Sequence, residues 1–331
     1  MFSLCQTRQR GEPAAPFWRG ALTACGWLLT SLLSGPVVAA PAEHVVIISL
    51  DGFPAYLLDD PKESLPNLEA LARRGVKTAG MRVSNPSVTW PNHTTLVTGV
   101  RPRRHGVLAN GMLIRSEPGI PVTIDSRRDK SELVRVPTLF DVAHAAGLST
   151  AGMAWPCTRN ATALDDNFPD VPESERYATP RLLEEMVADG ILSKDIESAL
   201  RGHSSPWYDN AWTTATTRLI AKRKPNLLLL HLLICDSTHH QYGPQTAAGY
   251  AAAAYADSCV GRVLAAIDAA GIGEKTAVFI VSDHGFITTE KALLPNSLLR
   301  QEGWLRATRP NKVEDARVSV VPEGGVALLY F

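Results

Sequence analysis

Residues 45–52 read VVIISLDG, a short apolar run that ends in an acid and a glycine. Such a run, rich in Val, Ile and Leu, is typical of a strand buried on both faces. Similar runs occupy residues 76–83, 149–154, 227–235 and 277–282, and helical periodicity lies between them at 65–74, 138–146, 211–224 and 247–270. This alternation predicts an α/β fold with a mostly parallel central sheet and helices on both faces.

The composition limits the classes of protein that the chain can represent. Its 331 residues suit either one large α/β domain or two ordinary ones. Lys and Arg total 33 and Asp and Glu total 33, so no overall field attracts nucleic acid or anionic lipid. We therefore predict no nucleic-acid-binding surface, and any bound phosphate must be held locally.

The N-terminal segment, residues 1–42, resembles a signal peptide. Arginines precede an apolar stretch over residues 21–39, and Ala40-Pro41-Ala42 predicts cleavage before Glu43. Residues 43–331 would then be the exported chain, in the periplasm or outside the cell. An uncleaved leader would instead anchor the chain in a membrane, and Cys25 leaves lipidation as a further alternative.

Three of the predicted strands are followed by a carboxylate. Asp51 follows residues 45–50, Asp236 follows 227–235, and Asp283 follows 277–282. Parallel strands place their carboxyl ends at one edge of the sheet, so these acids should converge. Three acids crowded together repel one another unless a cation neutralises them, although a single Asp at a strand end is more often a cap or turn residue.

Histidines accompany two of these acids. Asp236 and His240 are four residues apart, so they face the same way on one helical turn, and Asp283 is directly followed by His284. No C-x-x-C pair is present, so imidazole and carboxylate must hold any metal. This mixture of ligands favours Zn²⁺, with Mn²⁺ or Fe as alternatives.

Thr89 is the candidate nucleophile. The following Pro91-Asn92 is typical of a helix start, which places Thr89 close to a helix N-terminus. Free backbone N–H groups at that end favour an anion, and a metal-bound hydroxyl can lose its proton and attack phosphorus. From spacing alone, a simple helix-capping role is equally compatible with Thr89.

Taken together, these segments resemble the nucleotide pyrophosphatase/phosphodiesterase family of the alkaline phosphatase superfamily. The resemblance runs from about His44 to the end of the chain. The matching segments, in order, are DGF at 51–53, TWPNH at 89–93, RP at 101–102, HG at 105–106, Asp236 with HQYGP at 240–244, and SDHG at 282–285. It implies an alkaline-phosphatase-like fold over residues 43–331.

The resemblance also implies a two-metal site and its catalytic residues. One Zn²⁺ would lie among Asp51, Thr89, Asp283 and His284, and a second would be held by Asp236 and His240. Thr89 would attack phosphorus and form a phosphothreonine intermediate. Asn110 would hydrogen-bond a phosphate oxygen, although an asparagine before glycine is also an ordinary turn residue.

One difference from the family pattern concerns the second ion. The family has a further histidine near its C-terminus that completes this shell, whereas no histidine follows His284 here. Catalytic zinc normally has three protein ligands, so we expect that the domain lacks its C-terminal part. A non-catalytic protein that binds a phosphorylated ligand is the alternative. His93, His105, His144 and His231 are predicted to be packed or hydrogen-bonded side chains rather than ligands.

The sequence predicts the class of substrate, a small-molecule phosphate ester, but not the individual compound. A phosphodiester or nucleotide pyrophosphate is the first choice, with phosphomonoester, phosphonate and sulfate ester as alternatives. Trp90 and Phe53 are candidate substrate-binding residues because an aromatic ring can stack on a nucleobase, but both could instead pack in the core. Residues 156–206, rich in Pro, Asp, Asn and Ser, are a possible inserted lid or cap.

Overall fold

The computed structural model describes residues 41–115, 117, 119–309 and 312–331. The predicted leader lies outside the described residues, except for its last two positions. Among the helices that are described, none combines the length and the apolar character needed to cross a membrane.

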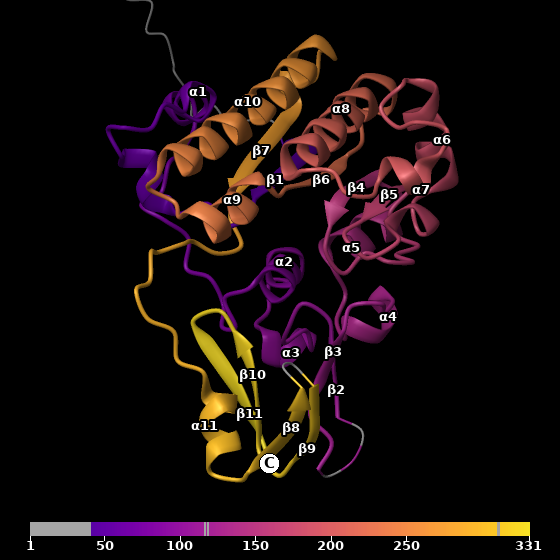
Figure 1. The fold of residues 1–331 in the computed structure, drawn as a ribbon. Helices are drawn as coiled ribbons and strands as arrows, with labels where there is room; N and C mark the ends of the chain where they lie inside the picture. The colour runs from indigo at the N-terminus through magenta and orange to yellow at the C-terminus, as the bar shows by residue number, and fades with distance from the viewer. Residues whose placement is uncertain (1–40, 116, 118, 310–311) are drawn as a thin grey trace, which may run out of the picture. The chain divides into compact units, whose positions relative to one another are not determined.

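The centre of the fold is a five-stranded parallel sheet with the order β5-β4-β6-β1-β7 (Figure 1). Its strands are β1 (His44–Leu50), β4 (Thr150–Trp155), β5 (Asp166–Pro169), β6 (Leu227–Leu232) and β7 (Thr276–Val281). Four of them overlap the predicted strands, and the α/β class with a parallel sheet is confirmed. β1 lies between β6 and β7, so the carboxyl ends of these three strands are neighbours.

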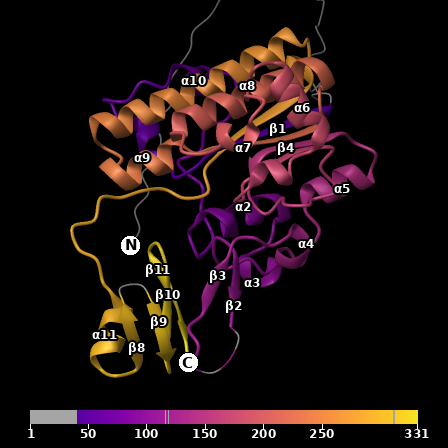
Figure 2. The ribbon, with the colours of Figure 1, turned by 45° about the vertical axis from the view of Figure 1, so that its right-hand side comes forward.

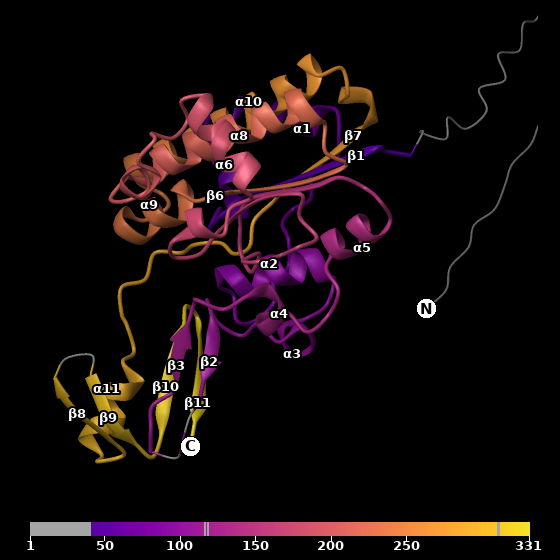
Figure 3. The same ribbon diagram turned by 90° about the vertical axis from the view of Figure 1, so that its right-hand side faces the viewer.

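Helices cover both faces of this sheet, as the alternating side chains of β1 require (Figure 3). Val46, Ile48 and Leu50 pack in one core cluster with side chains of α1, α6, α8 and α10. Val45 and Ile47 pack on the other face with side chains of α2 and α5. The near-continuous apolar sequence of β1 therefore reflects burial on both sides.

Four helices, α1, α5, α8 and α10, correspond to the predicted helical segments, and three of them agree to within one residue at each end. The α-helices are α1 (Pro66–Arg73), α2 (Thr89–Thr98), α3 (Pro102–His105), α4 (Lys130–Leu133), α5 (Leu139–Ala145), α6 (Pro180–Ala188), α7 (Ile196–Ala199), α8 (Ser205–Arg223), α9 (Ile234–Tyr242), α10 (Ala247–Ala269) and α11 (Pro295–Gln301). Short 3-10 helices are η1 (Ala55–Asp59), η2 (Ser174–Arg176) and η3 (Gly273–Lys275). The helix predicted from residue 211 begins earlier, at Ser205.

Two predicted segments differ from the structure. Residues 76–83 form no strand, and Val76 is 93% exposed, because Lys77, Gly80 and Arg82 interrupt the apolar surface that a buried strand needs. The run predicted at residues 227–235 is a strand only to Leu232, and α9 then begins at Ile234.

The possible lid, residues 156–206, contains β5, η2, α6 and α7. Because β5 pairs with β4 and α6 contributes to the core, this segment supplies part of the scaffold. A lid function for its remaining residues stays a prediction.

The smaller strands form antiparallel pairs: β2 (Met112–Ile114) with β3 (Thr123–Asp125), β8 (Leu305–Arg309) with β9 (Lys312–Ala316), and β10 (Ser319–Glu323) with β11 (Val326–Tyr330). The last two pairs belong to the C-terminal segment, drawn in yellow in Figure 2. The apolar run Val326–Tyr330 near the end of the chain is thus the strand β11.

Candidate metal centre

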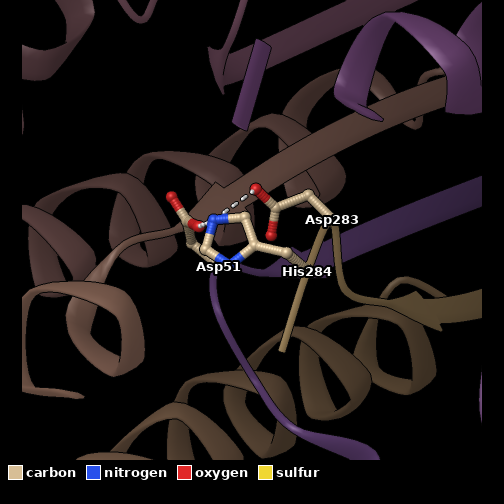
Figure 4. A group of neighbouring side chains, drawn as sticks. All are labelled: Asp51, Asp283 and His284. Carbon is tan, nitrogen blue, oxygen red and sulfur yellow. Dashed lines mark ion pairs between the residues drawn. The ribbon is translucent and has the colours of Figure 1, made fainter. Parts of the chain in front are cut away.

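Three side chains from the ends of β1 and β7 meet at one point (Figure 4). Asp51 follows β1, and Asp283 and His284 follow β7. His284 Nε2 lies 3.4 Å from Asp51 Oδ1 and 3.4 Å from Asp283 Oδ2. The predicted convergence of these two strand ends is therefore present.

The atoms that face this point fit a metal ion. Asp51 Oδ1 and Asp283 Oδ2 are buried and have no hydrogen-bond partner among the described residues. The other oxygen of Asp283 accepts a hydrogen bond from the Gly52 amide at 3.1 Å, which fixes the direction of the carboxylate. Buried carboxylate oxygens without partners are costly unless a cation satisfies them. The described residues thus contain a cluster that can bind a metal ion.

The electrostatics of the cluster support the same conclusion. Burial, together with the neighbouring carboxylates Asp283 and Asp236, holds the pKa of Asp51 well above its usual range. Burial also raises the pKa of Asp236. For Asp283, burial acts in the same direction, but the nearby imidazoles of His93 and His284 outweigh it and lower the pKa. A cation would relieve the repulsion that contributes to the raised pKa of Asp51.

The third acid lies on α9, directly beyond β6. Asp236 Oδ1 is 3.4 Å from His240 Nε2 one turn later, which confirms the predicted helical geometry. The same oxygen is 3.7 Å from His284 Nε2, so Asp236 borders the first cluster. The His240 side chain is 69% exposed, so this second pair opens toward solvent.

Asp209 explains why α9 begins where it does. This fully buried carboxylate of α8 accepts hydrogen bonds from the amides of Leu233 at 2.8 Å and Ile234 at 2.9 Å. It therefore satisfies N–H groups that the first turn of a helix leaves free. The cap fixes the helix that carries Asp236 and His240.

Thr89 is the first residue of α2, as the sequence predicts to within a turn. One turn later, His93 Nδ1 is 2.9 Å from the Thr89 carbonyl oxygen and 3.6 Å from Asp283 Oδ2. The first turn of α2 thus lies against the metal cluster. The amide of Trp90 donates a 2.9 Å hydrogen bond to Asn110 Oδ1, so the exposed Asn110 lies at the same helix end.

One protein-family model matches most of the chain. The model of the type I phosphodiesterase / nucleotide pyrophosphatase family matches residues 45–328. The chain belongs to this family. The predicted resemblance is therefore confirmed.

Individual relatives of the phosphodiesterase family are distant. Ectonucleotide pyrophosphatase/phosphodiesterase family member 3 of Rattus norvegicus is 24% identical over 246 residues, which is 74% of this chain and 25% of the rat protein. Venom phosphodiesterase 2 of Crotalus adamanteus is 22% identical over 264 residues, 78% of this chain and 29% of the venom enzyme. The chain thus matches between a quarter and a third of the length of these relatives.

Solved structures of the family share the fold. Murine ectonucleotide pyrophosphatase/phosphodiesterase 5 superposes with a TM-score of 0.54 at 20% identity, over 73% of this chain and 57% of the murine chain. An inactive threonine-to-alanine variant of the same murine protein, in complex with AMP, gives a TM-score of 0.53. These structures support the alkaline-phosphatase-like architecture of this family member.

The two aromatic residues predicted to bind substrate are mostly buried. Trp90 is 5% exposed and packs with Val107, Leu133 and Cys157, and Phe53 is 6% exposed and packs in the main core. Their role toward substrate stays a prediction. A different aromatic side chain borders the metal cluster: the Phe286 ring lies 4.7 Å from that of His240 and 5.7 Å from that of His284 between ring centroids. Its position two residues after His284 is the only sequence signal for it.

Three further histidines make hydrogen bonds, among them His105 and His231, which were predicted to be packed or hydrogen-bonded. His105 Nδ1 accepts from the Val107 amide and His105 Nε2 pairs with Thr95 Oγ1, and burial lowers its pKa to about 4. His239 Nδ1 is 3.1 Å from the Gly52 carbonyl oxygen. His231 contacts Asp51 itself, which its place in an apolar strand did not predict.

Proposed function

We propose that this chain hydrolyses phosphodiester or nucleotide pyrophosphate bonds of small molecules through a phosphothreonine intermediate. The observation that carries the proposal is the convergence of Asp51, Asp283 and His284 beside the first turn of α2, which begins with Thr89. Membership of the phosphodiesterase family adds independent support. The inactivity of the threonine-to-alanine variant of the murine relative points in the same direction.

The cluster of Asp51, Asp283 and His284 fits one metal ion, and Asp236 with His240 supply two of the three protein ligands expected for a second ion. Asp51, Thr89, Asp283 and His284 would hold one, and Asp236 with His240 would hold the other. Zn²⁺ suits these nitrogen and oxygen donors best, with Mn²⁺ or Fe as alternatives. When bound, the ions would neutralise phosphoryl oxygens and lower the pKa of the nucleophile.

The proposed reaction is an in-line displacement at phosphorus in two steps. Thr89 Oγ1 loses its proton and forms a bond to phosphorus while the bond from phosphorus to the leaving oxygen breaks, and the leaving oxygen takes up a proton. The covalent intermediate is a phosphothreonine that keeps the remaining ester group of the substrate. Water subsequently attacks this phosphorus and gives up a proton, the bond from phosphorus to Thr89 Oγ1 breaks, a phosphate monoester is released, and Oγ1 takes up a proton to become a hydroxyl again. The backbone N–H groups at the start of α2 favour the anionic group throughout.

Asn110 has a defined part in this scheme. Its Oδ1 accepts the Trp90 amide, so its Nδ2 group is left to donate. Placed at the same helix end as Thr89, Nδ2 can donate to a non-bridging phosphate oxygen as negative charge develops there.

Export is part of the proposal. The leader-like residues 1–42 and the names of the relatives, an ectonucleotide pyrophosphatase and a venom phosphodiesterase, support a periplasmic or extracellular location.

The decisive experiment compares the purified, zinc-loaded chain with its Thr89→Ala variant on bis-p-nitrophenyl phosphate and p-nitrophenyl phosphate. We expect diester hydrolysis that falls by about 10⁴-fold or more in Thr89→Ala, because the nucleophile is removed. Thr98→Ala, at the other end of α2, is the matched control and should stay active.

The other outcomes identify the alternatives. Preferential cleavage of the monoester would assign a phosphomonoesterase, and parallel assays with phosphonate and sulfate esters cover the remaining ester classes. A folded chain that binds a phosphate ester but shows no Thr89-dependent turnover would be a non-catalytic binding protein.

A further inference from the structure

His231 is a buried polar residue within an apolar strand. Strand β6 reads LLLLHL, and its imidazole is fully buried. An imidazole in such surroundings is costly unless both ring nitrogens have partners. Both do: His231 Nδ1 donates to the Ala154 carbonyl oxygen at 2.9 Å, and Nε2 lies 3.0 Å from Asp51 Oδ2.

These contacts give the two oxygens of the Asp51 carboxylate different surroundings. Oδ2 is held by His231, whereas Oδ1 lies 3.4 Å from His284 Nε2 and has no hydrogen-bond partner among the described residues. The carboxylate therefore cannot rotate without losing the His231 contact. Oδ1, the oxygen without a hydrogen bond to the described part of the chain, is the one that faces the metal cluster.

The backbone of β4 has an unusual conformation at Ala154, the residue whose carbonyl group accepts the hydrogen bond from His231. Ala154 has a φ of 53°, a left-handed conformation that residues with a side chain rarely adopt, and the β4–β5 register shifts between Met153 and Trp155. Unusual backbone of this kind persists where the surrounding structure requires it. Here it accompanies the carbonyl group that accepts from His231.

A second buried ring supports the same imidazole. The His93 ring lies 4.2 Å from the His231 ring between centroids, and it meets the Trp155 ring edge-on at 4.9 Å. His231 is thus held by packing as well as by hydrogen bonds. Its freedom to reorient is small.

We propose that His231 is a positioning residue for metal binding: it anchors Asp51 Oδ2 so that Oδ1 points at the ion. This inference rests on the proposed metal site. Partners that orient a metal ligand typically change metal affinity by about 10- to 100-fold when they are removed. His231 acts on the ion through Asp51 and does not touch it.

The test measures zinc affinity by competition with a chromophoric chelator, without any substrate. His231→Asn keeps a polar group near Nδ1 but cannot reach Asp51, whereas His231→Gln keeps an amide near the place of Nε2. We expect about 10- to 100-fold weaker zinc binding for His231→Asn and affinity within a few-fold of wild type for His231→Gln. The Co²⁺ absorption spectrum should change in His231→Asn and be largely restored in His231→Gln.

Two controls separate this inference from the proposed function. Asp51→Asn removes a ligand and should abolish tight zinc binding; if it does not, the proposed metal site is wrong. His144→Asn removes a half-exposed histidine of α5 and should leave zinc affinity unchanged.

A merely structural role for His231 would lower the melting temperature but leave zinc affinity and the Co²⁺ spectrum of the folded protein unchanged. Such a result in His231→Asn, alongside the expected loss in Asp51→Asn, would overturn the inference. If His231→Asn does not fold, His231→Gln decides alone, because a folded Gln variant with at least 10-fold weaker zinc binding contradicts an anchoring role that its amide preserves.

Discussion

At the scale of single residues, the proposed catalytic role of Asn110 can be tested directly because one of its two polar groups already has a hydrogen-bond partner in the protein. With Oδ1 bound to the Trp90 amide, only Nδ2 can act on a substrate. Asn110→Ala should therefore lower kcat by about 10²- to 10³-fold, as loss of one donor to a developing oxyanion does, with a smaller change in KM. Steady-state hydrolysis of bis-p-nitrophenyl phosphate measures both.

The matched control for Asn110 is Asn210→Ala. Asn210 is an exposed asparagine of α8 whose Oδ1 accepts from Arg262. Its substitution should leave kcat unchanged. Equal effects of the two substitutions, or an Asn110→Ala effect confined to KM, would remove Asn110 from the catalytic scheme.

The Asp51→Asn substitution should change the melting temperature in opposite directions with and without bound metal. Its folded pKa is raised by burial and by its acidic neighbours, so in the metal-free protein its ionisation opposes folding. Stability that is present below its unfolded pKa of 3.8 is lost as the pH rises toward the folded pKa. Asp51→Asn should therefore raise the melting temperature of the metal-free protein at neutral pH.

With zinc present, the same substitution should lower the melting temperature relative to wild type, because a ligand is lost. Scanning calorimetry in chelator and in zinc gives both comparisons. A variant that is less stable than wild type under both conditions would show that Asp51 serves packing rather than a metal site.

The sequence predicted some contacts of this site and not others, for physical reasons. Asp236 and His240 share one helical turn, so local periodicity was sufficient to place them together. The contact between His231 and Asp51 instead depends on β6 pairing with β1, which sets Ser49 opposite His231. Nothing in either strand's own pattern specifies that register.

At the scale of elements, the start of α9 depends on Asp209. Burial raises the pKa of this carboxyl to about 6, in spite of the hydrogen bonds from the Leu233 and Ile234 amides. Because the unfolded value is 3.8, the native state binds more protons between these values, and stability falls as the pH rises through this range.

Asp209→Asn should remove this pH dependence. Between pH 4 and pH 7, the unfolding free energy of wild type should fall by on the order of 3 kcal/mol relative to the variant, measured by urea denaturation. Asp195→Asn, which removes the charge of an exposed cap residue of α7, is the matched control. Parallel pH profiles for wild type and Asp209→Asn would contradict the assignment.

Some element boundaries were not predicted from the sequence because they depend on tertiary contacts, as the Asp209 cap does. The strand predicted to residue 235 ends at Leu232 because a carboxylate from α8, distant in sequence, caps the next helix. Likewise β5 is only four residues long and contains Asp166 and Asn167, so its polarity concealed a strand that pairs with β4 at the edge of the sheet. Long apolar strands and helices closed by glycine needed no such tertiary information.

At the scale of the whole molecule, the metal cluster joins segments that are far apart in the chain. Asp51 follows β1, Asp283 and His284 follow β7, and Asp236 lies on α9 beyond β6. The order of these motifs was enough to indicate the family, whereas the distances between them depend on the parallel sheet. The two proposed ions would together cross-link three adjacent strand ends.

Zinc should therefore stabilise the molecule unevenly, and hydrogen exchange followed by mass spectrometry can measure the pattern. A ligand at 1,000 times its Kd stabilises the native state by about 4 kcal/mol, which slows exchange by global unfolding everywhere and exchange by local opening only near the ion. We expect the largest gains in protection in residues 51–54, 233–242 and 282–287, and small gains in the β10–β11 hairpin. Asp51→Asn should remove this pattern. Equal gains in fast-exchanging amides of all segments, or gains centred on the hairpin, would place the ion elsewhere.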